Sequence, residues 1–278
     1  MQIHRYENQT QLSPFARGLS YGDGFFTTAR IQDQQVLLLP LHLERLSMAA
    51  ERLQFNDFDA LKMAQYLMDL VLPEQAVLKV IVTREAAERG YAIPQNCRCQ
   101  VLVSIESTSI EYCASHPLRL MVCQTPVSLQ PMLAGIKHLN RLDNVLAKTE
   151  VQSLEFDDGL MLAPRLSTTL NSEPNNRHAH VVCSTQANVW LQMRGKVITP
   201  ALKDAGVNGI IRQLLLAEHP NAEEVDVVRL SDFAKAEEVF LSNAVRGIMP
   251  IAQVGEQHYH QHTKTQQLSD WLKALAHD

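Results

Sequence analysis

The sequence has little that would place the protein in a membrane, in a disulfide-stapled class or on nucleic acid. No stretch approaches the ~18 consecutive apolar residues of a membrane helix. The N-terminus has no basic segment before an apolar core, so we expect no signal peptide. Five cysteines, an odd number in a long chain, argue for a reducing compartment. With 25 basic against 30 acidic residues, nothing suggests a nucleic-acid surface. We therefore expect a soluble cytoplasmic protein that binds neither membrane nor nucleic acid.

The common catalytic motifs are also absent. There is no P-loop, no G-x-G-x-x-G, no G-x-S-x-G and no H-E-x-x-H. Cys97-Arg98-Cys99 has neither the spacing nor the second pair of a zinc site. His258, His260 and His262 alternate, and on a strand they would share a face that could chelate a metal. We favour a solvated turn there, and we assign no metal site.

What is present is the composition of a globular protein, with apolar patterns typical of strands and helices. The chain has 278 residues, 46% of them hydrophobic and 20% charged. Apolar spacing predicts helices near 43–53, 58–70, 139–146, 210–218 and 263–275, and strands near 35–39, 76–83, 99–105, 118–124, 159–162, 180–184, 189–192, 196–199, 225–230 and 239–242. Residues 165–178 are polar and predict a surface loop.

The order of these elements predicts an α/β (α+β) fold with two lobes. We place a smaller N-terminal lobe at 1–113, a linker at 114–117 and a larger C-terminal lobe at 118–278. Clefts between such lobes are common ligand sites.

Three segments carry the chemistry only in combination. The first is the run G-D-G-F-F-T-T-A-R at 22–30, joined to H-L-E-R-L at 42–46. The second is A-G-I-K-H-L-N-R at 134–141. The third is G-V-N-G-I-I-R at 206–212, which opens a helix and has S-N-A at 242–244 downstream.

These segments, in this order over nearly the whole chain, resemble the fold-type IV pyridoxal-phosphate enzymes. That group contains the branched-chain and D-amino-acid aminotransferases, and within it the pattern is most similar to the 4-amino-4-deoxychorismate lyases. The resemblance implies the two-lobed fold of the D-amino-acid aminotransferases, pyridoxal 5'-phosphate as cofactor, a small-molecule substrate and a homodimer.

Lys137 is the candidate catalytic residue. It is one of nine lysines, most of which we expect to be solvated surface charges. It follows the apolar residues 133–136, where a charged amine is costly and its pKa should fall. A neutral amine can form a Schiff base with an aldehyde and later move protons. The resemblance makes Lys137 the lysine that binds the cofactor covalently.

Other candidates for cofactor binding lie in all three segments. Arg45 alone would be an ordinary helix arginine, but the resemblance makes it the residue that grips the cofactor phosphate. The start of the predicted helix at 210 offers unpaired N–H groups to an anion, so we assign main-chain phosphate contacts to Ile210 and Ile211. Asn243 and Ala244 would add a second contact from the loop after the strand at 239–242.

Four further residues are candidates for the substrate pocket. Thr28 and Arg30 share one face of a strand, so both could face the cleft. Tyr91 lies in the segment Arg89-Gly90-Tyr91, which matches a loop that reaches the substrate in relatives. His138 follows the candidate lysine. Strand packing and a surface loop explain these residues equally well.

One position departs from the family. Relatives carry a glutamate that binds the pyridine nitrogen and keeps the cofactor ring a strong electron sink. Here the matching position holds Cys183. Either Cys183 takes that place, as a thiolate beside the pyridinium, or the polar insert shifts the register and brings in Glu173. Cys183 as a small buried hydrophobe is the simpler interpretation.

The loss of this glutamate bears differently on the two reactions of the family. Transamination depends on the ring alone to stabilise a carbanion, whereas the lyase reaction is also driven by formation of an aromatic ring. We therefore predict a lyase that converts 4-amino-4-deoxychorismate to 4-aminobenzoate and pyruvate in folate synthesis. The alternatives are a D- or branched-chain amino-acid aminotransferase, or a degenerate relative that binds the cofactor without turnover.

Overall fold

The structure, a computed structural model, describes residues 1–5, 13, 15–85, 90–95, 97–163 and 179–276. The chain divides into two compact units. The first contains Met1–Ile110 and Ile136–Asn140, and the second contains Glu111–Gly135 and Arg141–Asp278. The segment with the candidate lysine is therefore grouped with the first unit, although both its neighbours in sequence belong to the second.

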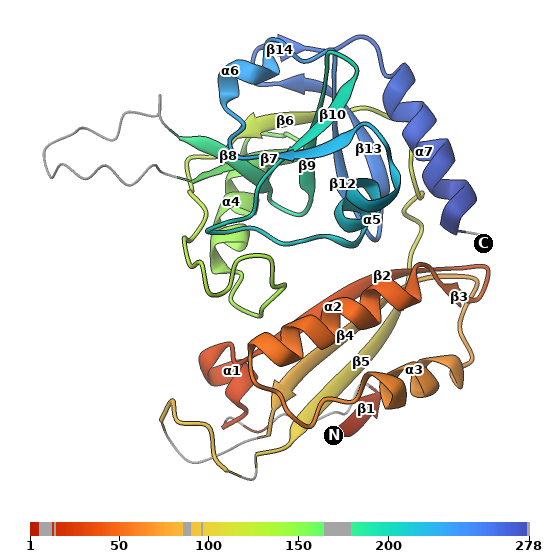
Figure 1. The fold of residues 1–278 in the computed structure, drawn as a ribbon, viewed down its shortest axis with the longest axis vertical. Coiled ribbons are helices and arrows are strands. Elements are labelled where there is room, and N and C mark those ends of the chain that lie inside the picture. Colours follow the sequence, from red (N-terminus) through yellow and green to blue (C-terminus); the bar gives the residue numbers. More distant parts are fainter. Residues whose placement is uncertain (6–12, 14, 86–89, 96, 164–178, 277–278) are drawn as a thin grey trace, which may run out of the picture. The chain divides into compact units, whose positions relative to one another are not determined.

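The first unit is a five-stranded sheet with helices packed on it. Its sheet has the order β1-β5-β4-β2-β3. The elements are β1 (Gln2–Arg5), α1 (Arg17–Tyr21), β2 (Gly24–Gln32), β3 (Gln35–Val36), α2 (Leu39–Arg52), α3 (Ala60–Met68), β4 (Gln75–Arg84) and β5 (Cys99–Ser107). Figure 1 shows α2 lying across β2 and β4. Ala76, Leu78, Val80 and Val82 of β4 alternate into the core, as a half-buried strand requires.

The second unit is built on a nine-stranded sheet, with β14 paired to β13. The hydrogen-bonded path is β11-β10-β9-β12-β13-β6-β7-β8. Its strands are β6 (Leu118–Val122), β7 (Asp158–Ala163), β8 (His180–Ser184), β9 (Asn188–Met193), β10 (Lys196–Pro200), β11 (Ala222–Val225), β12 (Glu238–Asn243), β13 (Gly247–Val254) and β14 (Gln257–His258). Its helices are α4 (Leu142–Ser153), α5 (Ile210–Glu218), α6 (Leu230–Phe233) and α7 (Thr263–Ala276).

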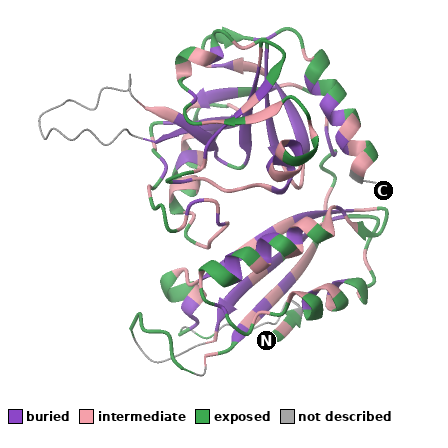
Figure 2. Ribbon diagram, in the orientation of Figure 1, coloured by how far each residue is buried: buried purple, intermediate pink, exposed green. Residues whose placement is uncertain are grey.

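This larger sheet curls until its two outer regions meet. Val181 on β8 donates its N–H to the carbonyl of Val228, just beyond β11, at 2.8 Å. Apolar side chains from one face of the curl, at alternate positions of its strands, form a core cluster, and Figure 2 shows buried residues concentrated in the strands. The predicted α/β fold class is confirmed.

Several predicted elements differ from the structure. The strand expected at 35–39 stops at Val36, and Pro40 lies in the first turn of α2, where its missing N–H costs nothing. The strand expected at 225–230 is wrong, because β11 ends at Val225 and α6 begins at Leu230. The helix expected from Leu139 begins at Leu142. The polar loop at 165–178 lies outside the described residues.

No helix among the described residues has the length and apolar character needed to cross a membrane.

Candidate functional site

The segment that carries Lys137 is an extended strip along the edge of β2. The N–H of Phe26 donates to the carbonyl of Lys137 at 2.9 Å, and the N–H of Leu139 donates to the carbonyl of Gly24 at 3.0 Å. β3 pairs only with the far end of β2, at residues 31 and 32, so this part of the edge is available. Lys137 is therefore fixed by main-chain bonds to a strand and does not lie in the helix that follows.

Two glycines of the first motif make room for this strip. A Cβ on Gly24 would lie 2.8 Å from Cδ1 of Leu139, and one on Gly22 would overlap Oδ1 of Asn140. Gly22 also has φ +64, which side-chain-bearing residues rarely adopt. The G-D-G and I-K-H-L-N-R motifs thus pack on one another, which explains why they matter together.

The amine of Lys137 lies over an aromatic ring. Its Nζ is 4.6 Å from the centroid of the Phe26 ring, and the residue is half-buried. A ring face attracts an ammonium group. The neutral amine that covalent chemistry requires stays a prediction.

Arg45 contacts the same strand, β2, from the helix that packs on it. It projects from α2, is only 6% exposed, and donates from Nη2 to Oγ1 of Thr27. Thr27 follows Phe26 directly, so the guanidinium and the Lys137 amine contact adjacent residues of β2. The structure brings these two sequence-predicted groups to one stretch of one strand.

The start of α5 in the second unit presents main-chain donors. Gly209 is the N-cap, no side chain caps the helix, and its first turn has no acidic residue. The first N–H groups of a helix have no partner within it, so those of Ile210 and Ile211 are suited to an anion. A Cβ on Gly209 would overlap Oδ1 of Asn188, whose Nδ2 donates to the carbonyl of Val207 at 2.9 Å.

The turn after β12 lies at the same end of the sheet. Ser242 is paired with Asn188 at the start of β9, which sets Asn243 and Ala244 beside the α5 start. Oδ1 of Asn243 accepts the N–H groups of Val245 and Arg246, at 3.0 and 2.8 Å. Oδ1 of Asn243 therefore closes its own turn, while its Nδ2 donates to the carbonyl of Gln186 at 3.5 Å.

Cys183 lies on β8, paired with Met161, and is 8% exposed. Burial raises the pKa of its thiol to about 12, although the nearby charge of Arg141 lowers it. The thiol form is thus favoured over the thiolate. The neighbouring carboxylate, Asp158, accepts the hydroxyls of Ser184 and Thr185, at 2.8 and 2.5 Å. Glu173, the other candidate, lies outside the described residues.

The candidate substrate residues are all in the first unit. Thr28 and Arg30 share the face of β2 that carries Phe26. Arg30 donates from Nη1 to the carbonyl of Ile110 at 2.5 Å, which ties it to the end of the unit. The main chain of His138 pairs with Phe25.

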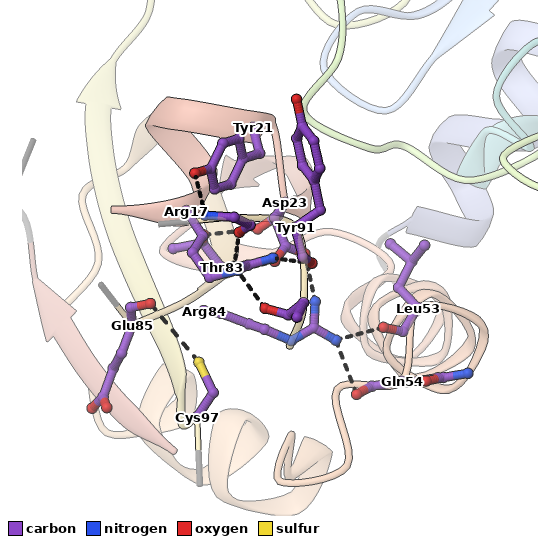
Figure 3. A network of polar contacts seen from close by, with 12 residues as sticks. Arg17, Tyr21, Asp23, Leu53, Gln54, Thr83, Arg84, Glu85, Tyr91 and Cys97 are labelled. Atoms are coloured by element: carbon purple, nitrogen blue, oxygen red, sulfur yellow. Dashed lines mark hydrogen bonds and ion pairs between the residues drawn. The ribbon is translucent and has the colours of Figure 1, made fainter. Parts of the chain in front are cut away.

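Tyr91 is 84% exposed, yet hydrogen bonds hold the main chain at residues 90–92 (Figure 3). The guanidinium of buried Arg17 donates to three successive carbonyls, those of Gly90, Tyr91 and Ala92, at 3.1 to 3.2 Å. Its Nε pairs with Asp23 at 2.7 Å, and the ring of Tyr21 lies edge-on to that of Tyr91. Arg89 lies outside the described residues.

The C-terminal histidines do not form a metal site in the part of the chain that the structure describes. The rings of His258 and His260 stack at 6.3 Å. No cluster of three or more His, Cys, Asp or Glu side chains among the described residues could hold an ion.

Residues 24–254 match the family described as Amino-transferase class IV. The chain belongs to this family. It is 32% identical, over 88% of both chains, to an aminodeoxychorismate lyase of Vibrio harveyi. The crystal structure of 4-amino-4-deoxychorismate lyase from Pseudomonas aeruginosa matches with a TM-score of 0.81 and 31% identity, over 95% of both chains. A putative branched-chain-amino-acid aminotransferase of Methanocaldococcus jannaschii is 26% identical, over 89% of this chain and 84% of its own.

Class IV enzymes use pyridoxal phosphate, and the residues present here have the chemistry to hold it. A lysine amine can bind its aldehyde. A buried guanidinium and an uncapped, acid-free helix start suit its phosphate. The donor set of this class IV chain therefore fits the cofactor.

The sequence did not predict three residues that lie in the hydrogen-bonded groups around Arg45 and Tyr91. Thr27 and His42 lie within the motifs, but only the packing of α2 on β2 shows that Thr27 contacts both Arg45 and His42. Arg17 lies outside the motifs and meets its loop 73 to 75 residues further along the chain. No local pattern signals such a contact.

Proposed function

We propose that this chain is a pyridoxal-phosphate-dependent lyase that converts 4-amino-4-deoxychorismate to 4-aminobenzoate and pyruvate. The observation that carries the proposal is the similarity to two such lyases, at 31 and 32% identity over at least 88% of the chain. It exceeds the 26% identity to the putative aminotransferase.

The proposed cofactor contacts come from all three motif segments. Lys137 would bind the aldehyde carbon, and Arg45 would bind phosphate oxygens as a charged donor. The N–H groups of Ile210 and Ile211, with a contact from Asn243 or Ala244, would bind the phosphate as well. When bound, pyridoxal phosphate supplies an electron-withdrawing ring that stabilises negative charge at the amine-bearing carbon of the substrate.

Lys137 would have a second role when the cofactor and the substrate are both bound. Its Nζ accepts the proton from the amine-bearing ring carbon. The electron pair of that C–H bond forms the last double bond of the aromatic ring, while the bond to the enolpyruvyl oxygen breaks. The departing group takes a proton, which Lys137 can return, and leaves as pyruvate. Atoms and charge balance without a further reactant.

Cys183 favours this reaction over transamination. We assign it to the pyridine nitrogen, where a neutral thiol offers no negative charge to hold a proton. The weaker electron sink harms a reaction without aromatisation more than one with it. Thr28, Arg30, Tyr91 and His138 are assigned to the substrate, whose carboxylates suit the cation and hydroxyls among them. We further propose a cytoplasmic homodimer.

The test supplies the purified chain with pyridoxal phosphate and synthetic 4-amino-4-deoxychorismate, and quantifies pyruvate and 4-aminobenzoate. Equal amounts of both products are expected from the wild type. Lys137→Ala should lower the rate by about 10³-fold or more, and Lys196→Ala, at an exposed hairpin lysine, should leave it unchanged.

Two other outcomes would replace the proposal. Keto-acid-dependent conversion of a D- or branched-chain amino acid, without pyruvate from the test substrate, would make the chain an aminotransferase. A visible absorption band with pyridoxal phosphate, removed by Lys137→Ala but accompanied by no product, would make it a cofactor-binding relative without turnover.

A further inference from the structure

Three polar side chains form a buried hydrogen-bonded group between α2 and β2 of the first unit. Thr27, His42 and Arg45 are 1%, 2% and 6% exposed. His42 and Arg45 are three residues apart on α2, so they lie on one face of the helix, and that face packs on β2. Polar groups this deeply buried are costly unless they bond to one another, and these do.

The donors and acceptors among these three side chains determine the direction of each hydrogen bond. A guanidinium only donates, so Oγ1 of Thr27 accepts the bond from Nη2 of Arg45. The same Oγ1 lies 2.6 Å from Nδ1 of His42. Among the described residues these are the two contacts of the hydroxyl, so its single hydrogen goes to His42. Nδ1 then accepts, and the ring proton of His42 is on Nε2.

The charge state of His42 agrees with this assignment. Burial, and secondly the charge of Arg45, hold the pKa of the imidazole well below its usual value. A neutral ring has the lone pair that the Thr27 hydroxyl needs, whereas an imidazolium would place a second cation beside Arg45.

We propose that Thr27 and His42 are positioning residues that orient the Arg45 guanidinium for the phosphate of the cofactor. This inference rests on the proposed function, because it takes Arg45 as the phosphate ligand. Because the guanidinium is rigid and planar, a hydrogen bond to one of its nitrogens restricts the orientations open to the other two. An arginine side chain otherwise loses much rotamer freedom when it binds a ligand, and Thr27 and His42 impose that order before the phosphate arrives.

The competing explanation is that the three residues only join α2 to β2. The two explanations differ in what they predict for ligands with and without a phosphate. Pyridoxal has the aldehyde for Lys137 but no phosphate for Arg45. A positioning role affects pyridoxal phosphate alone, whereas a general loosening of the helix affects both ligands.

The experiment compares Thr27→Val, which keeps the shape but removes the hydroxyl, with Thr27→Ser, which keeps the hydroxyl. Dissociation constants for pyridoxal phosphate and for pyridoxal are measured by titrating the visible absorption of the bound ligand. Thr27→Val should weaken pyridoxal phosphate by about tenfold, the cost of one charge-assisted hydrogen bond, and leave pyridoxal unchanged. Thr27→Ser should bind both ligands like the wild type.

A second pair of variants covers the case in which Thr27→Val does not fold. His42→Asn keeps an acceptor near the place of Nδ1, and His42→Leu removes it. His42→Leu should weaken pyridoxal phosphate by about threefold, less than the loss of the hydroxyl itself, and His42→Asn should restore most of the affinity. Thermal unfolding without ligand establishes that each variant is folded.

Two results overturn the inference while the proposed function stands. One is Thr27→Val with wild-type affinity for pyridoxal phosphate, and the other is an equal loss for pyridoxal and its phosphate. A wild-type chain that shows no absorption band with either ligand overturns both the inference and the proposed function.

Discussion

The two units present their candidate cofactor groups in different chemical forms. In the first unit they are side chains, Lys137 and Arg45, which contact adjacent residues of β2. In the second they are main-chain N–H groups at the start of α5, next to the turn that follows β12. Side chains need partners that orient them, as Thr27 orients Arg45. Main-chain groups need only a backbone that is held in place. The close packing of Asn188 on Gly209 holds the backbone at the start of α5.

The largest effect on the affinity for pyridoxal phosphate is expected at Arg45, in the first unit. Removing its guanidinium should cost more than any single main-chain contact, because a charged donor to phosphate contributes more than a neutral one. Arg45→Ala should weaken pyridoxal phosphate by about 100-fold, and pyridoxal much less. Titration of the visible absorption measures both. Equal losses for the two ligands would mean that Arg45 acts on the fold and not on the phosphate.

The second unit can be tested at Gly209. A methyl group there overlaps Oδ1 of Asn188 and displaces the start of α5. Gly209→Ala should weaken pyridoxal phosphate by about tenfold. Ile210→Val changes a buried side chain but keeps its N–H, so it should bind within about twofold of the wild type. If Ile210→Val had the larger effect, the side chains and not the main chain would form the contact.

A substitution that loosens the main chain around Tyr91 tests substrate binding separately from cofactor binding. Arg17→Ala removes the donors to three carbonyls and should raise KM for the substrate by about fivefold, with kcat nearly unchanged. Arg17→Lys should be intermediate, because one ammonium cannot span the three carbonyls. Arg98→Ala, at an exposed position, is the control. A fall in kcat without a rise in KM would contradict the role given to Tyr91.

The smallest effect is a pH dependence of stability from His42. Its pKa is lowered in the folded state, so below about pH 6.5 the unfolded chain binds a proton that the folded chain does not. The contribution of neutral His42 to the free energy of unfolding is therefore fully present above pH 6.5. It declines as the pH falls below that value, by about 1 kcal/mol per pH unit. Urea unfolding at pH 7.5 and 5.5 should show a larger loss for the wild type than for His42→Asn. Equal losses would mean that His42 is protonated in the folded chain.

Much of the fold was predictable wherever apolar periodicity is strong. The helix at 210–218 and the strand at 180–184 have the predicted bounds. Predictions were wrong where one residue has two meanings. Pro40 was interpreted as the end of a strand but lies in the first turn of α2. The valines at 225–228 suggested a strand, whereas tertiary packing ends β11 at Val225 and starts a helix at Leu230.

The candidate site was predictable only in part, for a related reason. Lys137 and Arg45 could be proposed from the sequence because motifs record residue types in order, and their roles stay predictions. Thr27, His42 and Arg17 were missed because their roles depend on contacts between distant segments, which only folding produces. The thiolate suggested for Cys183 from the sequence is wrong, because burial raises the pKa of its thiol to about 12.

The central claim is that the amine at position 137 binds the cofactor covalently. Its most direct test is to incubate the purified chain with pyridoxal phosphate, reduce the complex with borohydride and locate the modified lysine by peptide mass spectrometry. Stoichiometric labelling of Lys137 alone, among the nine lysines of the chain, is the predicted result. Labelling that is spread over surface lysines such as Lys196, or that persists at full level in Lys137→Ala, would contradict the account.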